Sequence, residues 1–337
     1  MKVRACGLEF ESVRGWECLP AGWSHPDVAS VATDEAANVY LFCRGDWPVI
    51  VYDSAGRLLH SWGTGQFSYR THGMFIVGGH LYLVDDGGNR VGEYTLNGTF
   101  VRAIGPVGAP SETGYTTPCS SDYAAAVGAR AGTVQRSAGP YNRPTNLAVG
   151  PEGDFYVCDG YGNARVHRFS RDAALIGSWG EPGSEPGQLM TPHGVWAHSD
   201  GRVFVADRQN DRIQIFSAEG QFLEQWLDVQ RPQDIFVDGD GLVYVAELAW
   251  LPGDVSARRG PISALAPGRV SVYAPNGELL LRWGDADPTS EGSFAAPHAI
   301  WVDRDGSIYV AEVTDTFAVR RGLAPPGTPT LQKFARI

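Results

Sequence analysis

Short apolar segments alternate with polar turns along almost the whole chain, and their apolar positions recur every second residue, which is typical of β-strands. One recurring half-unit is an apolar strand, a turn containing Asp or Gly, and a second strand that ends in Val-Ala-Asp or a close variant. Asp-Gly pairs supply the positive φ that a tight hairpin needs. The clearest copies span residues 147–159, 195–207, 235–247 and 300–312.

A second half-unit consists of a strand, a Gly turn and a strand that ends in Trp-Gly. Clear copies cover residues 51–63, 168–180 and 272–284. Together the two half-units give four strands per repeat, which is the pattern of a β-propeller blade. Six copies of the first half-unit therefore predict an all-β, six-bladed β-propeller. These copies lie near residues 28–44, 72–86, 145–160, 193–208, 232–248 and 297–313.

We expect residues 1–337 to form one propeller domain, since repeat folds exceed the usual domain length. The sixth repeat lacks its second half, because only residues 331–337 resemble a strand after Glu312. The ring is therefore expected to close by pairing of strands from the two termini, which removes an exposed edge. Two spans, 106–140 and 249–268, are too long for turns and are interpreted as insertions of undetermined role that border the pocket.

The composition restricts the partners of such a fold. The net charge is −11, and Lys and Arg form no cluster, which argues against nucleic acid and anionic membranes as ligands. No apolar stretch is long enough to cross a bilayer, and the first residues lack a signal-like apolar core. Five cysteines without C-x-x-C spacing are interpreted as reduced thiols, so we expect a cytoplasmic protein. Propellers form small-molecule sites at the mouth of the central channel, so we expect a small-molecule substrate with a carboxylate or carbonyl. The oligomeric state is not predicted.

Three histidines begin the first strand of the second, fourth and sixth repeats. They are His72, His193 and His298. Equivalent positions in alternate blades point towards one axis, and three imidazoles with an open fourth position are the pattern of catalytic zinc. The alternative is that each histidine only completes a loop, but three equivalent copies favour the metal. Imidazole also suits other transition metals. The other histidines are interpreted as surface or turn residues: His25, His60, His80, His167 and His198.

Three further polar residues follow the second strand of a repeat. They are Arg44, Tyr161 and Arg208. Two guanidinium groups suit a substrate carboxylate, because their paired N–H groups match its two oxygens. A tyrosine beside a dication and an arginine can become acidic enough to act as a base.

Residues 155–169 and 192–216, together with the Phe-Cys-Arg-Gly-Asp stretch at 42–46, resemble peptidyl-α-hydroxyglycine α-amidating lyases. That family has an NHL-type six-bladed propeller, and the resemblance covers most of the chain. Together with the expected location, it implies that this chain is a cytoplasmic-type homologue of the family. It implies that the three repeat histidines hold zinc. It also implies that Tyr161 is the catalytic tyrosine and that Arg44 and Arg208 are the active-site arginines.

The resemblance implies a zinc-dependent carbon–nitrogen lyase. Its substrate would be a carbinolamide, an N-(α-hydroxy) amide or urea of the α-hydroxyglycine or ureidoglycolate type, cleaved to an amide and a glyoxylate-type product. A metal-dependent propeller hydrolase or lactonase is an alternative, because zinc-bound water has a pKa of about 7 in favourable sites. A non-catalytic NHL binding scaffold is a third interpretation, but it leaves the three histidines unexplained. The substrate and the metal are not identified by the sequence.

Two departures from the family bear on other sites. The family's structural calcium site would use the carbonyls of Val31 and Met74, but Ala299 replaces its only carboxylate. Backbone oxygens alone bind calcium weakly, so at most a weak calcium site is expected. Gly162 replaces the cysteine that follows the family's catalytic tyrosine, so the disulfide of the secreted members cannot form there. This agrees with the expected cytoplasmic location.

Overall fold

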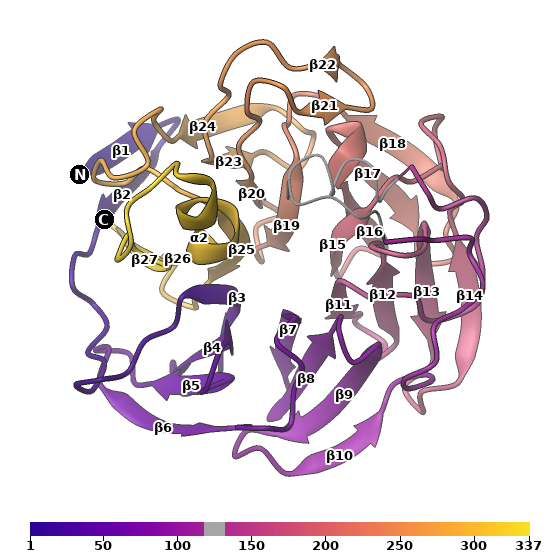
Figure 1. The fold of residues 1–337 in the computed structure, drawn as a ribbon, viewed down its shortest axis with the longest axis horizontal. Helices are drawn as coiled ribbons and strands as arrows, with labels where there is room; N and C mark the ends of the chain where they lie inside the picture. The colour runs from indigo at the N-terminus through magenta and orange to yellow at the C-terminus, as the bar shows by residue number, and fades with distance from the viewer. Residues whose placement is uncertain (118–131) are drawn as a thin grey trace.

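The computed structural model describes residues 1–117 and 132–337, and these form a ring of six antiparallel sheets around a central axis (Figure 1). The prediction of an all-β six-bladed propeller is confirmed. The innermost strands of neighbouring blades contact one another around the whole ring. All six predicted first half-units form the two innermost strands of a blade.

The strands run from the axis outward within each blade. Blades 1 to 3 contain β3 (Asp27–Thr33), β4 (Val39–Arg44), β5 (Val49–Tyr52) and β6 (Leu58–Trp62); β7 (Thr71–Val77), β8 (His80–Asp85), β9 (Arg90–Thr95) and β10 (Phe100–Ala103); and β11 (Asn146–Val149), β12 (Phe155–Asp159), β13 (Arg165–Phe169) and β14 (Leu175–Trp179). Blades 4 to 6 contain β15 (Pro192–Ala197), β16 (Arg202–Asp207), β17 (Arg212–Ser217) and β18 (Phe222–Trp226); β19 (Pro232–Val237), β20 (Val243–Glu247), β23 (Arg269–Tyr273) and β24 (Leu279–Trp283); and β25 (Pro297–Val302), β26 (Ile308–Glu312), β27 (Leu331–Arg336), β2 (Leu8–Ser12) and β1 (Lys2–Ala5).

The sixth blade closes the ring with strands from both ends of the chain. The C-terminal strand β27 lies between β26 and β2, with Phe10 opposite Arg336 and Ile308 opposite Phe334. The predicted pairing of the terminal strands is therefore confirmed. Phe10 is fully buried, and its ring stacks on Trp283 with the centroids 6.2 Å apart.

The recurring Trp and Gly of the second half-unit pack against each other across blade boundaries. Trp62, at the end of the outer strand of blade 1, covers the turn at Gly98 in blade 2. A Cβ on Gly98 would lie 2.5 Å from the indole, and its φ of +90° also favours glycine. Trp179 covers Gly220 and Trp226 covers Gly277 in the same way. The recurring Trp of the sequence thus contacts the turn glycine of the next blade.

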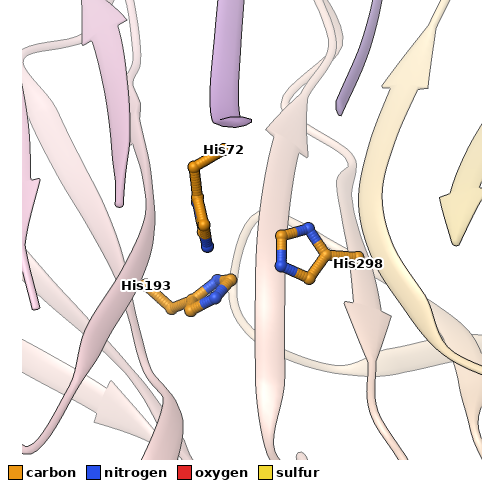
Figure 2. Close-up of side chains that lie close together, drawn as sticks. All are labelled: His72, His193 and His298. Atoms are coloured by element: carbon orange, nitrogen blue, oxygen red, sulfur yellow. The ribbon is translucent and has the colours of Figure 1, made fainter. Parts of the chain in front are cut away.

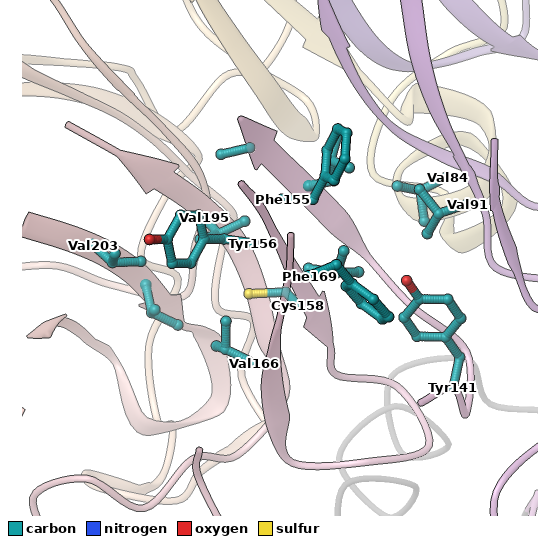
Figure 3. Close-up of a cluster of buried hydrophobic side chains, with 14 of the residues drawn as sticks. Val84, Val91, Tyr141, Phe155, Tyr156, Cys158, Val166, Phe169, Val195 and Val203 are labelled. Atoms are coloured by element: carbon teal, nitrogen blue, oxygen red, sulfur yellow. The ribbon is translucent and has the colours of Figure 1, made fainter. Parts of the chain in front are cut away.

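Apolar side chains also fill the space between blades. Around blade 3, Phe155 and Phe169 pack with Val84 of blade 2 and Val195 of blade 4 (Figure 3). Tyr141 joins this cluster, and its hydroxyl donates a hydrogen bond of 2.9 Å to the Ile104 carbonyl. Neighbouring blades share no backbone ladder across these boundaries, so side-chain packing sets their relative positions.

Aromatic rings close the central channel three residues after the position of the repeat histidines. Phe75, Trp196, Phe236 and Trp301 come from the inner strands of blades 2, 4, 5 and 6. Their neighbouring ring centroids lie 4.5–5.9 Å apart. These rings therefore pack against one another across the channel.

Three segments outside the repeat lie near the histidine end of the inner strands. The insertion 249–268 contains the short strands β21 (Val255–Ser256) and β22 (Gly260–Pro261). Residues 313–330 contain α2 (Thr314–Phe317) and η2 (Val319–Arg321), which the repeat pattern did not predict; Figure 1 shows α2 inside the ring, close to the axis. The insertion 106–140 is described outside residues 118–131.

Within the described residues, no helix is long and apolar enough to span a bilayer. Four cysteines are described, and none of them forms a disulfide: Cys43 and Cys158 are buried, and Cys6 and Cys18 are exposed. Cys119 lies outside the described residues.

Because Phe10 packs inside the blade that closes the ring, removing its side chain is expected to destabilise the fold strongly. Replacing Phe10 with Ala should lower the free energy of unfolding by about 3–5 kcal/mol, because the side chain is fully buried in the terminal blade. Chemical denaturation measures this change. The matched variant F100A removes a phenyl group that is 57% exposed on the outer strand β10, and it should cost less than about 1 kcal/mol. Equal losses in the two variants would contradict the closure described here.

Candidate metal centre

The three repeat histidines converge on one point inside the ring (Figure 2). His72 lies on β7, His193 on β15 and His298 on β25, and all three are buried. One ring nitrogen from each lies within 4.8 Å of the others, and the ring centroids are 4.7–4.9 Å apart. The predicted convergence of alternate blades is what the structure contains.

Each histidine is oriented by the blade that follows it. Nδ1 of His72, His193 and His298 lies 2.5–2.8 Å from the backbone carbonyls of Thr145, Gln233 and Ala29 respectively. A carbonyl only accepts, so Nδ1 carries the proton and Nε2 keeps its lone pair. Blades 2, 4 and 6 thus supply the imidazoles, and blades 3, 5 and 1 supply the groups that fix their tautomer.

The residue after each histidine must be small. A Cβ on Gly73 would lie 2.5 Å from Oδ1 of Asn146, and a Cβ on Gly194 would lie 2.7 Å from the Gln233 carbonyl. These glycines allow the next blade to approach closely enough for its carbonyl to reach the imidazole. Ala299 occupies the equivalent place after His298.

Buried carboxylates anchor the loops that lead into the histidine strands. Asp85, Asp207 and Glu312 each end the second strand of a blade, and each accepts a backbone N–H three or four residues ahead of the histidine, at 2.7–3.0 Å. This explains why the repeat ends in an acidic residue. The carboxylate holds the start of the inner strand, and with it the imidazole.

The surroundings keep the imidazoles neutral. Burial lowers the pKa of His72 well below its usual value, and the other two histidines lower it further. Burial and the charge of Arg208 lower the pKa of His193 in the same direction. Burial, followed by the charge of Arg44, lowers the pKa of His298 to about 3. Neutral imidazoles are the form that binds metals.

The donor set fits zinc or a related transition ion. Zinc–imidazole bonds of about 2.0–2.1 Å place tetrahedral ligand nitrogens roughly 3.4 Å apart. The histidine nitrogens, within 4.8 Å of one another, need only small side-chain adjustments to reach that spacing. Three neutral nitrogens leave at least one coordination position open, and they do not distinguish zinc from other divalent transition ions.

The other predicted site residues lie around this cluster. The hydroxyl oxygen of Tyr161 is 3.0 Å from Nε2 of His72 and 3.1 Å from Nε2 of His193. Arg208 lies against the Tyr161 ring, with its Cζ 5.2 Å from the ring centroid and Nη1 3.4 Å from the hydroxyl. Arg44 lies in the same pocket as Tyr161, Arg208 and His298. All six residues proposed from the sequence thus lie together.

The loop that carries Tyr161 is closely packed. A Cβ on Gly162 would lie 2.1 Å from Oδ1 of Asn142, so a cysteine would not fit there without moving that side chain. The hydroxyl of Thr113, in the insertion 106–140, donates to the Gly162 carbonyl at 2.5 Å. The described part of this insertion therefore supports the Tyr161 loop directly.

Pocket residues that sequence reasoning missed include Arg231, Gln233 and Phe317. Gln233 occupies the histidine position of the fifth repeat, so alignment of the repeats could have found it. Arg231 and Phe317 had no such signal. Phe317 lies on α2, outside the repeat, and Arg231 is placed by its contact with Trp250 of the insertion 249–268.

Two interpretations of the remaining histidines were wrong. His167 is fully buried on β13, where its ring nitrogens contact Asp159 and Ser178. His25 is buried between Thr330 and Glu17. Each partners a polar group that would otherwise be unpaired in the interior.

The residues of the expected weak calcium site lie on the inner strands. Val31 and Met74 are buried on β3 and β7, and Ala299 packs in the same apolar cluster as Val31. Asp234 of blade 5 holds in its repeat the position that Ala299 holds in the sixth, and it accepts hydrogen bonds from Asn146 and from the Ile300 N–H. Calcium binding stays a prediction.

Comparisons with known proteins place this site in context. Residues 141–169 and 189–216 match the NHL repeat. The chain is similar to peptidyl-glycine alpha-amidating monooxygenase B of Xenopus laevis (27% identity, 85% of this chain and 32% of that protein) and to NHL repeat-containing protein 3 of Homo sapiens (28%, 88% and 81%). It is also similar to peptidyl-alpha-hydroxyglycine alpha-amidating lyase 1 of Drosophila melanogaster (25%, 92% and 60%).

The chain thus spans about a third of the length of the Xenopus protein that it matches. Among solved structures, a streptogramin B lyase superposes with a TM-score of 0.58 at 13% identity and covers 97% of each chain. At that identity the likeness concerns the propeller fold alone.

A metal held by the histidines should depend on each of them. Purified protein loaded with zinc and dialysed should retain roughly one equivalent, whereas H193A should retain less than about a tenth of that, because two imidazoles alone hold zinc weakly. Elemental analysis measures the content. The control H60A, which removes an exposed histidine on β6, should bind as the wild type does. Full zinc retention by H193A would contradict the site.

The orienting carbonyls make a second prediction that leaves every proposed ligand in place. G194A should weaken zinc binding by about 10–100-fold, because the added methyl displaces the Gln233 carbonyl from His193. The matched control is G177A on β14, where a Cβ would meet nothing closer than 3.9 Å. Competition with a chelator reports both affinities. Equal affinities would show that the carbonyl does not matter.

Proposed function

We propose that this protein is a metal-dependent lyase that cleaves the carbon–nitrogen bond of a carbinolamide. The observation that supports it most strongly is the placement of the Tyr161 hydroxyl, within 3.0–3.1 Å of two of the three convergent imidazoles and beside Arg208. A three-histidine site alone would serve many reactions. A phenol at its edge adds a group that can remove a proton from a bound hydroxyl.

The metal that His72, His193 and His298 would hold supplies Lewis acidity for a substrate hydroxyl. Tyr161 takes the proton of that hydroxyl, since its oxygen already lies against the histidine cluster. The guanidinium of Arg208 lies over the Tyr161 ring and donates to its hydroxyl at 3.4 Å, which orients the phenol. The hydrogen bond from the Thr113 hydroxyl to the Gly162 carbonyl supports the loop that carries this phenol.

Arg44 and Arg208 bind the carboxylate next to the reacting carbon. Both are buried, and both line the same pocket as His298. Arg44 is held by Asp27 at 3.4 Å and is close to the Thr71 carbonyl and the Thr316 hydroxyl. Among the described residues, the guanidinium of Arg208 has only the Tyr161 hydroxyl as a hydrogen-bond acceptor, and its Nε is buried without a partner. A substrate anion would satisfy it.

The reaction balances without an added reactant. The substrate has the form R–CO–NH–CH(OH)–COO⁻. Loss of the hydroxyl proton forms the C=O of glyoxylate, the C–N bond breaks, and its electron pair stays on nitrogen. The nitrogen takes up a proton and leaves as the amide R–CO–NH2. Tyr161 can return the proton that it removed, so no water is consumed.

The names of the relatives agree with this chemistry. The Drosophila protein is an alpha-hydroxyglycine alpha-amidating lyase, and the match runs over 92% of this chain. The human relative is named only for its NHL repeat, so similarity alone does not identify the reaction. The support comes from the site residues together with the relatives.

The proposal predicts a defined product pair. Zinc-loaded protein should convert N-benzoyl-α-hydroxyglycine to benzamide and glyoxylate in equal amounts, and Y161F should lower kcat by about 10²–10⁴-fold while keeping the metal. Chromatography of both products measures the rate. A hydrolase would yield benzoate instead.

Two controls separate chemistry from folding. Y156F alters a tyrosine of blade 3 that lies outside the pocket, and it should keep wild-type activity. R208K should raise KM and leave the metal content unchanged, because lysine keeps the positive charge but loses the two-point contact with the substrate carboxylate. Unchanged turnover after metal removal, or in Y161F, would disprove the proposal.

A further inference from the structure

We infer that Gln233 is a specificity-determining residue that accepts a hydrogen bond from the amide N–H of the substrate, so that secondary amides are selected over N-alkylated ones. This inference rests on the proposed function, since it assigns the substrate class of the same pocket. Gln233 holds in blade 5 the position that a histidine holds in blades 2, 4 and 6. Its backbone carbonyl orients His193, which leaves its side chain for another role.

The Gln233 side chain belongs to the pocket. It is fully buried, and it lines the same space as His298, Tyr161 and Arg208. Its amide orientation is set by one contact: Nε2 donates to the Arg231 carbonyl at 3.0 Å. Oε1 is therefore the free end, and it has no hydrogen-bond partner among the described residues.

A buried acceptor without a partner is costly. Leaving such a group unpaired destabilises a protein by about 1–3 kcal/mol, so native structures rarely keep one without a reason. The described residues offer Oε1 no donor at hydrogen-bonding distance, although three arginines line the pocket: Arg44, Arg208 and Arg231. A donor that arrives with the substrate would satisfy it.

The insertion 249–268 holds Gln233 in this orientation through Arg231. The Arg231 guanidinium lies over the Trp250 ring, 4.2 Å from its centroid, and contacts the Ala249 carbonyl and Asp254 at 3.1–3.2 Å. The Arg231 backbone N–H also donates to Asp211 at 2.6 Å. The side chain and the backbone N–H of Arg231 thus both hold in place the residue whose carbonyl accepts the hydrogen bond from Nε2 of Gln233.

The chemistry of the substrate leaves one group for this acceptor. In a carbinolamide with a carboxylate, the hydroxyl would face Tyr161 and the metal that the three histidines would hold, and the carboxylate would face Arg44 and Arg208. The remaining donor next to the reacting carbon is the amide N–H. A site that pairs with an N–H rejects an analogue that lacks it, because its own acceptor then stays unpaired. Gln233 thus acts on binding and positioning, not on proton transfer.

The test uses a pair of unreactive probes that lack the α-hydroxyl group. Hippurate has the N–H, and N-benzoylsarcosine carries a methyl in its place. Calorimetry with the zinc-loaded protein gives Kd for each. Wild type should prefer hippurate by about tenfold or more, and Q233L should reduce that preference to within about twofold by weakening hippurate. Comparing the ratio between variants cancels the intrinsic effect of the methyl group.

Q230L is the matched control. Gln230 is a buried glutamine three residues earlier that donates to backbone carbonyls at Leu248 and Pro267 and does not line the pocket. It should keep the wild-type preference. If Q233L does not fold, as judged by its melting temperature, Q233M takes its place with the same expectation. A wild-type preference retained in the Gln233 variant, or no preference in the wild type, overturns the inference.

Turnover of N-benzoyl-α-hydroxyglycine separates this inference from the proposed function. Turnover with an unchanged preference in Q233L overturns the role of Gln233 alone. A preference that depends on Gln233, without turnover by the wild type, supports the role of Gln233 and overturns the lyase.

Discussion

The hydrogen bond between each repeat histidine and the backbone of the next blade is the contact on which the site depends. Three such bonds, of 2.5–2.8 Å, join blades 2 to 3, 4 to 5 and 6 to 1. These bonds form only if the inner strands of neighbouring blades lie close together and at the same level along the propeller axis. No backbone ladder joins these strands, so the height and spacing come from side-chain packing.

The packing that meets this requirement is distributed around the whole ring. The Trp-Gly contacts join blades at the outside, and the aromatic rings of Phe75, Trp196 and Trp301 join them at the axis. Paired terminal strands keep the sixth blade in place. Buried carboxylates then hold the start of each histidine strand. A scaffold of this kind fixes the positions of the three imidazoles, which reduces the entropy cost of ordering them around a ligand.

The fold could be predicted from the sequence because a repeat converts position in the chain into position around an axis. The same reasoning brought together His72, His193 and His298. Gln233 stands at the equivalent position of the fifth repeat, but it was not predicted as a site residue because a glutamine does not indicate metal chemistry. Its meaning depends on an unpaired oxygen that only coordinates reveal. Phe317 could not be found, because α2 lies outside the repeat and no period relates it to the axis.

X-ray absorption spectroscopy at the zinc edge of the loaded protein reports the ligands of the ion itself. Three imidazole nitrogens at about 2.0–2.1 Å are expected, with the remaining coordination supplied by light atoms. A shell that contains sulfur, or an oxygen shell without imidazole scattering, would contradict metal binding by the three histidines.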